Sequence, residues 1–266
     1  MDLERQLDTF LSRTPTLGKD VFIARGAVAA EKGKLLIELP KPNYPAWATH
    51  SVNLARKMKA EDFRLPVSVT EGRGRVTANV IGIIENQAPT RHLKLEVPVN
   101  GDEVHPNVER DLAKVALIER HHGSGRVQIG LVSGFGFRER CAAASTVAHD
   151  CHHLVVVGTD EASMALAANT LAATGGGQVV VKNGRVIGQV DLPLGGLMGV
   201  ERAEVVAAKA ESIVQGFRTC GCKLNNPNMQ LSLLGLVVIP ELRISDKGLV
   251  DTTRFTFLPV VDGPAN

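Results

Sequence analysis

Two segments of this sequence have the apolar spacing and the end signals of long helices, and both lie among a larger number of strand-like segments. In the first, Asp160 stands at the position of a helix cap, and three glycines at 175–177 end the apolar stripe. The second covers residues 201–217. An alternating βαβ chain needs more helices. The pattern therefore predicts an α+β fold with a mixed, mainly antiparallel sheet, two principal helices packed on it and no TIM barrel.

The strand-like segments are apolar or alternating runs with turn residues between them. Residues 92–99 alternate cleanly, and residues 155–157 are three consecutive valines that predict a buried strand. The dipeptide Asn183-Gly184 between two apolar runs predicts a hairpin. Near the N-terminus, residues 21–39 predict two strands separated by a charged turn at 31–33.

Clustered prolines divide the chain. Pro40, Pro42 and Pro45 fall within six positions, where neither a helix nor a central strand continues. This predicts a small β segment at 1–40, a proline-rich linker at 41–66, a main domain at 67–258 and a tail at 259–266. The single Trp47 then belongs to the linker, where it contacts either the main domain or another part of the protein.

The composition excludes several classes of protein. The net charge is only +2, and no basic run is interleaved with aromatic residues, so no nucleic-acid surface is expected. The longest apolar stretch, 231–239, is too short to cross a bilayer, and residues 1–10 are too charged for a signal peptide. A cytoplasmic protein without a membrane partner is expected, and its four cysteines are expected to be free thiols.

Histidines concentrate in one stretch, immediately before the three valines. His149, Asp150, His152 and His153 fall within five positions. On a helix, His149 and His153 would have the spacing of two zinc ligands. In an extended chain, Asp150 and His152 would share one side and be suited to proton transfer. The third interpretation is a solvated turn at the entry of the strand, and the residues alone leave all three open.

Several segments occur in the order in which they occur in the C-terminal region of bacterial adenine deaminases. The matching segments are 119–123 (ERHHG), 134–136 (GFG), 145–152 (STVAHDCH), 157–159 (VGT), 164–167 (MALA), 175–177 (GGG), 192–194 (LPL), 196–198 (GLM) and 238–240 (VIP). On these segments the chain resembles that family, whose members belong to the amidohydrolase superfamily. The segment 1–40 resembles the end of the small β domain that flanks the catalytic barrel in such enzymes.

The resemblance implies the hydrolytic deamination of adenine to hypoxanthine and ammonia, with metal ions in a (β/α)₈ barrel activating water. This chain has neither the H-x-H pair of the first barrel strand nor the residues that a barrel needs. The expectation is an accessory C-terminal domain, inactive without the barrel, that either pairs with a separately encoded barrel subunit or is a relic with no activity. Manganese, or iron or zinc, is then expected in the barrel, and no metal is assigned to this chain.

The resemblance also selects candidate site residues. His149, Asp150 and His152 are expected near the mouth of the barrel as catalytic candidates, and His121, His122 and Ser145 as contacts to the purine. Two alternatives stay open. One is a structural or oligomerisation module that uses the apolar segment 229–239, and the other is a stand-alone module that binds a metal or a purine through its histidines.

Overall fold

The first of two compact units is a small three-stranded sheet. The computed structural model describes residues 21–38, 42–67 and 74–262, and the chain divides into the units Met1–Tyr44 and Pro45–Asn266. In the first unit, β1 (Val21–Ala24), β2 (Ala27–Glu31) and β3 (Lys34–Leu35) pair in antiparallel order. The prediction of two strands here was wrong, because Arg25 and Gly26 adopt positive φ values and make an additional turn.

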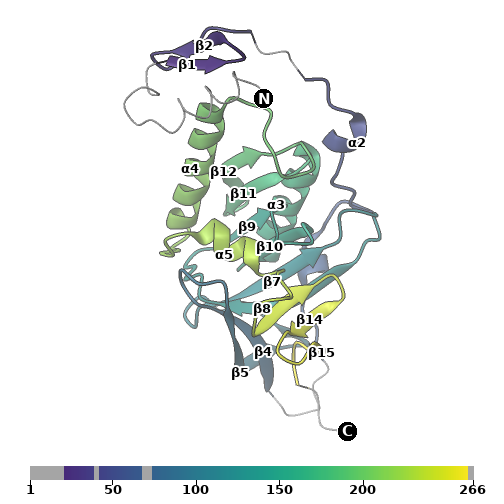
Figure 1. Cartoon of the computed structure of the whole chain (residues 1–266). Coiled ribbons are helices and arrows are strands. Elements are labelled where there is room, and N and C mark those ends of the chain that lie inside the picture. Colours follow the sequence, from purple (N-terminus) through teal and green to yellow (C-terminus); the bar gives the residue numbers. More distant parts are fainter. Residues whose placement is uncertain (1–20, 39–41, 68–73, 263–266) are drawn as a thin grey trace. The chain divides into compact units, whose positions relative to one another are not determined.

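The second unit is built on one nine-stranded sheet (Figure 1). The strand order is β12-β11-β9-β10-β7-β8-β4-β5-β6, and every pairing is antiparallel except that of β4 with β8. The sheet is open at β12 and β6, so the described residues form no barrel. The predicted mixed, mainly antiparallel sheet is confirmed. The strands are β4 (Arg75–Ile83), β5 (Thr90–Asn100), β6 (Glu103–Val104), β7 (Leu112–Ile118), β8 (Val127–Ser133), β9 (Cys141–Ser145), β10 (Leu154–Gly158), β11 (Gly177–Lys182) and β12 (Arg185–Asp191).

Helices cover both faces of this sheet (Figure 1). The two long helices are α3 (Glu161–Thr174) and α4 (Ala203–Thr219), as predicted, and the shorter ones are α2 (Ala46–Thr49), η1 (Ala60–Phe63) and α5 (Pro227–Leu233). Asp160 caps α3, since its carboxylate accepts the Ser163 amide at 3.0 Å. The side chains of α3 and η1 pack on one face, and those of α4 and α5 on the other. Alternate side chains of β9, β10 and β11 point to these two layers.

A second, three-stranded sheet completes the layer of α4 and α5. It consists of β13 (Leu242–Ser245), β14 (Gly248–Asp251) and β15 (Thr256–Leu258), and Leu242, Ile244 and Leu249 are buried against the large sheet. The apolar segment 229–239 forms most of α5 and the turns that follow. Leu231 and Leu234 are buried in the core, so most of this segment is occupied within the chain itself.

The predicted domain limits stay predictions, although several contacts bear on them. The boundary between the two units follows Tyr44. Met58 and Phe63, within the predicted linker, are buried beside α3. The amide of Asn79 donates to the carbonyl of Val260, within the predicted tail, at 2.8 Å. Of the helices formed by residues 21–38, 42–67 and 74–262, none has the length and apolar content required to cross a membrane.

Candidate functional site

Two loops that carry the predicted site residues leave the large sheet at the same end. Loop 119–126 follows β7, and loop 146–153 connects β9 to β10. In the sheet, Leu154 is paired with Ile118 and Val155 with Ser145. The ends of three adjacent strands therefore bring the histidines at 121 and 122 to those at 149–153, although about 30 positions separate them in the sequence.

The histidine stretch forms a turn at 149–151 before β10 begins. The amide of His152 donates to the carbonyl of Ala148 at 2.6 Å, and His152 has a φ of 49°. Both the helical and the extended interpretation are therefore wrong, and the turn is the geometry that forms. The His149 ring lies 5.7 Å from the His152 ring, centroid to centroid, and that contact replaces the helical pairing of His149 with His153.

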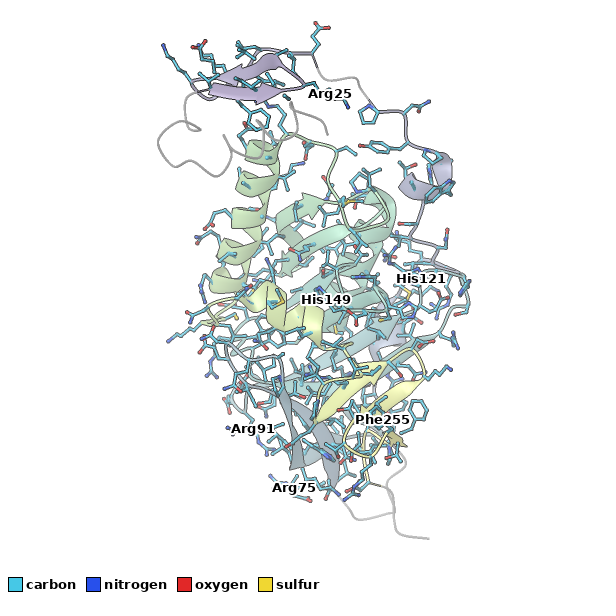
Figure 2. All side chains as sticks on the ribbon, in the orientation of Figure 1. Arg25, Arg75, Arg91, His121, His149 and Phe255 are labelled. Atoms are coloured by element: carbon cyan, nitrogen blue, oxygen red, sulfur yellow. The ribbon has the colours of Figure 1, made fainter. Side chains whose placement is uncertain are left out.

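The turn is anchored to α5 on one side and to loop 119–126 on the other. His149 lies beside α5 (Figure 2), and its amide donates to the carbonyl of Ser232 in that helix at 2.8 Å. Nε2 of His121 lies 2.8 Å from the Cys151 carbonyl, and the His121 ring lies 4.8 Å from the ring of His153. Four imidazoles from two loops therefore form one cluster, defined here as the histidine cluster: His121, His149, His152 and His153. His122 and Asp150 are exposed on the same two loops.

Burial keeps part of this cluster uncharged. Burial lowers the pKa of His152, and the positive charges of His149 and Arg120 lower it further. Burial likewise lowers the pKa of His153, with a further contribution from His121. Both rings are therefore neutral at pH 7. The Nδ1 atoms of His149, His152 and His153 are buried and have no hydrogen-bond partner among the residues that the structure describes. Neutral imidazoles offer one donor and one acceptor each to a polar ligand.

Glu119, at the end of β7, shapes the loop that carries His121 and His122. Its carboxylate accepts the backbone amides of His121, His122 and Ser124 at 2.5, 2.8 and 3.0 Å, and the Ser124 hydroxyl at 2.8 Å. Burial alone would raise the pKa of Glu119, but these hydrogen bonds lower it to about 2. Glu119 was not among the predicted site residues, although it opens one of the segments that carry the family resemblance.

Two further residues lie beside these loops. Ser145 is fully buried, and its hydroxyl bonds to the backbone of Val147 at 3.0 and 3.2 Å, so it supports the turn from inside the sheet. Asp246, on the turn between β13 and β14, was not predicted. Its carboxylate lies 4.0 Å from Nε2 of His153 and also pairs with Arg126 at 2.9 Å. No local sequence signal connects Asp246 to histidines about 100 positions earlier.

The described part of the chain does not fit the metal centre that the family implies. Its one group of three potential ligands within mutual reach is Glu103, His105 and Glu161, far from the histidine cluster in the sheet. There the ammonium of Lys114, which is fully buried, donates to Glu103 and to Glu161, each at 2.7 Å. A lysine thus occupies the position of a cation between these carboxylates. No step is assigned to a metal in this chain.

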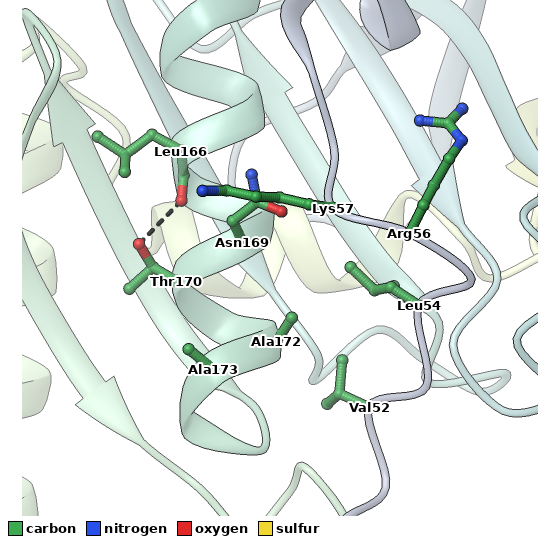
Figure 3. Close-up of a pocket in the computed structure, with 9 residues that line it drawn as sticks. All are labelled: Val52, Leu54, Arg56, Lys57, Leu166, Asn169, Thr170, Ala172 and Ala173. Atoms are coloured by element: carbon green, nitrogen blue, oxygen red, sulfur yellow. Dashed lines mark hydrogen bonds between the residues drawn. The ribbon is translucent and has the colours of Figure 1, made fainter.

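An apolar groove of about 650 Å³ lies between residues 52–57 and the outer face of α3 (Figure 3). Val52 and Leu54 form one wall, and Leu166 and Ala173 belong to the other. The amide group of Asn169 is already bonded to both backbone groups of Met58, at 2.9 Å each. None of the predicted site residues lines this groove, and it contains no pair of acid and base groups.

Known proteins resemble this chain over most of its length. The family model described as "Adenine deaminase C-terminal domain" matches residues 87–256. An adenine deaminase of Roseobacter denitrificans is 50% identical over 98% of this chain, and one of Ruegeria sp. is 49% identical over 97%. A more distant one, of Moorella thermoacetica, is 43% identical over 96%.

These matches cover only part of the relatives. The chain spans 43% of the Roseobacter protein and 42% of each of the other two. The matched region carries the open sheet, the histidine cluster and Glu119. The chain therefore belongs to the adenine deaminase family, of which it contains the C-terminal domain.

Proposed function

We propose that this domain is the accessory part of an adenine deaminase, which converts adenine and water to hypoxanthine and ammonia, and that it works against a metal-bearing barrel outside these 266 residues. The observation that carries the proposal is the histidine cluster, in which two loops bring four imidazoles together at one end of the sheet, and three of them, all on loop 146–153, have buried Nδ1 atoms without a hydrogen-bond partner among the described residues. The similarity to proteins named adenine deaminase supplies the reaction.

The side chains of the two loops suit a purine. Adenine has ring nitrogens that accept hydrogen bonds and an amino group that donates them, and the ring nitrogens of an imidazole such as that of His149 or His152 can serve either kind of group. Asp150 is exposed beside them and can take up a proton. We assign His149, Asp150 and His152 to the mouth of the barrel, and His121 and His122 to contacts with the purine. Ser145 supports the turn that carries the first three.

Exposed apolar side chains next to the cluster suit a protein partner. Trp47 is 79% exposed and Met198 is 62% exposed. The segments that carry them meet, because the amide of Gly195 donates to the carbonyl of Ala48 at 2.7 Å. Contiguous exposed apolar surface is typical of protein interfaces. We propose that the barrel covers this surface, defined here as the rim at Trp47 and Met198. The barrel then also holds the manganese, or the iron or zinc, of the enzyme. Such a reaction belongs to purine metabolism, which we place in the cytoplasm.

The experiment replaces the matching region of the Roseobacter denitrificans adenine deaminase with this chain. We expect the chimera to release ammonia from adenine and this chain alone to release none. In the chimera, His149→Ala and His152→Ala should each lower kcat/KM at least about tenfold, because they remove a group that bonds to the substrate or moves a proton. The matched control is His105→Ala, on a different loop, which should leave kcat/KM unchanged.

Either of two results would contradict the proposal. One is turnover of adenine by this chain alone, which would place the complete active site within it. The other is an active chimera in which both histidine variants match the control, which would separate the cluster from the chemistry.

A further inference from the structure

Arg120, the residue after Glu119, binds three separate segments at the histidine cluster. The residue is 1% exposed. Nε donates to the carbonyl of His152 at 2.5 Å, Nη1 to the carbonyl and the hydroxyl of Ser51 at 2.8 and 3.1 Å, and Nη2 to the carbonyl of Gly195 at 2.9 Å. One side chain therefore connects the histidine turn to the two segments that carry Trp47 and Met198.

The third segment is shaped around this guanidinium. Gly196 has a φ of 73°, and a Cβ placed there would lie 2.9 Å from Nη1 of Arg120 and 3.0 Å from its Cζ. The backbone thus approaches the cation more closely than any other residue type allows. This observation is independent of the hydrogen bonds, and it shows that loop 193–198 is folded against Arg120.

Only arginine suits these contacts. Its guanidinium is planar and presents five donors in fixed directions, whereas the three donors of lysine leave from a single point. The acceptors are backbone carbonyls and one hydroxyl, and no carboxylate of the described residues pairs with Arg120. A buried cation without an acidic partner is costly unless its donors are satisfied, and here the acceptors of three segments satisfy them.

We infer that Arg120 is a positioning residue that holds the His152 turn, and with it the imidazoles of the histidine cluster, in a fixed place relative to the rim at Trp47 and Met198. It touches no reacting group itself. The inference rests on the proposed function for its meaning in catalysis, but the positioning can be measured in this chain alone. Through Arg120, a barrel that contacts the rim would also fix the position of the histidines.

Arg243 provides a matched control. It is fully buried too, and it donates to the carbonyls of Ala88, Leu233, Ile239 and Pro240. None of these four residues belongs to the loops at the histidine cluster. Arg120→Met and Arg243→Met both remove a buried guanidinium. Arg120→Lys keeps the positive charge but loses the planar arrangement of donors. The measurements are amide hydrogen exchange at 149–153 and NMR titration of the imidazoles, in the full chain.

We expect Arg120→Met to speed amide exchange at 149–153 about tenfold or more, because the turn loses a charged hydrogen bond. It should also raise the pKa of His152 and of His153, since the positive charge of Arg120 lowers both. The other charged groups that act on these two rings, His149, Asp150, His121, Asp246 and Glu119, stay in the chain. Arg120→Lys should speed exchange with a smaller change in the titrations. Arg243→Met should change both measurements less than Arg120→Met does, since its one acceptor near the turn is Leu233, which follows Ser232 in α5.

The inference is overturned if Arg120→Met leaves exchange and titrations as in the unchanged chain, or if Arg243→Met alters them equally. If Arg120→Met does not fold, the test is amide exchange at 149–153 in Arg120→Lys compared with Arg243→Lys. Exchange no faster in Arg120→Lys than in Arg243→Lys would overturn the inference. In the chimera, Arg120→Lys should lower kcat more than it raises KM. A perturbed turn with unchanged turnover in the chimera would refute the proposed function and leave the positioning in place.

Discussion

At the scale of single residues, buried charges at the ends of β7 hold neighbouring loops in place. Glu119 binds three backbone amides at one end of this strand, and Lys114 joins two carboxylates near the other. Each charge is satisfied by specific partners, which is the condition for burying it. These residues contribute to stability through their hydrogen bonds. Removing one partner leaves a buried polar group without a hydrogen bond, and that group then costs its full desolvation penalty.

Glu119→Gln should lower the free energy of unfolding by about 1–3 kcal/mol at pH 7. The NH₂ group that replaces one carboxylate oxygen cannot accept a hydrogen bond from the backbone N–H groups that face it. The pKa of Glu119 is depressed from 4.5 to about 2, so its contribution is complete above pH 4.5 and is lost as the pH falls toward 2. Urea denaturation between pH 7 and pH 3 checks this. The difference in free energy of unfolding between Glu119→Gln and the unchanged chain should become smaller below pH 4.5. Glu109→Gln, at an exposed position, should have the same free energy of unfolding as the unchanged chain at each pH.

Lys114→Met should lower the free energy of unfolding by about 3–5 kcal/mol, because it leaves Glu103 and Glu161 without their buried cation. Burial alone would raise the pKa of Glu103, and its bonds to Lys114 and Arg64 lower that pKa to about 2. The control is Lys94→Met, whose ion pair with Asp262 is exposed, and it should cost less than about 1 kcal/mol. Equal losses in denaturant unfolding would contradict this account.

At the scale of elements, α4 approaches the sheet unusually closely through glycine. A Cβ on Gly188 of β12 would lie 2.5 Å from the carbonyl oxygen of Ser212 in α4, and one on Gly216 would lie 2.9 Å from Cβ of Val180 in β11. The absence of side chains at these two positions lets backbone pack on backbone. Helix α4 can then bury Ile213 and Phe217 in the same core as Phe135 and Phe137.

Gly188→Ala should lower the free energy of unfolding by about 1–3 kcal/mol, since the added methyl group has to push α4 away from β12. Gly74→Ala is the control. Nothing lies within 4 Å of a Cβ at Gly74, so the change there should stay within about 0.5 kcal/mol. Thermal unfolding followed by circular dichroism distinguishes the two. A tolerant Gly188 would mean that α4 packs less closely than the structure indicates.

At the scale of the whole molecule, the unit Pro45–Asn266 contains all three buried clusters, whereas the described part of Met1–Tyr44 buries only Ala29 among its hydrophobic side chains. Phe22, Leu35 and Leu36 of the small sheet are more than half exposed. A sheet of so few residues is marginal in water without a covering layer. We expect that layer to come from outside the described residues of this unit.

Removing residues 1–44 should therefore leave a folded protein. We expect the fragment 45–266 to unfold cooperatively at a midpoint within a few degrees of the whole chain, because its core is complete. Circular dichroism in the near and far ultraviolet checks this. A fragment with far-ultraviolet signal but no near-ultraviolet signal would show that the small sheet is needed for core packing.

The fold class and both long helices could be predicted because their signals are local. The cap at Asp160, the glycines after α3 and the Asn183-Gly184 turn each act through neighbours within a few positions. Errors arose where a local pattern allowed several conformations. The stretch 149–153 has histidines at helical spacing and next to valines, and only contacts with Ser232 and loop 119–126 select the turn.

The sequence by itself determined the elements of this protein, its family resemblance and the residue types available for chemistry, because these are properties of short segments and their order. Only the tertiary structure decided that Glu119 and Arg120 organise the loops, that Asp246 reaches His153 and that Lys114 lies between two carboxylates. These groups are from 2 to about 100 positions apart, and the pairing of β10 with β7 and β9, together with the packing of β13 and β14 on the large sheet, brings them together. A local sequence pattern does not determine which strand ends become neighbours in the sheet.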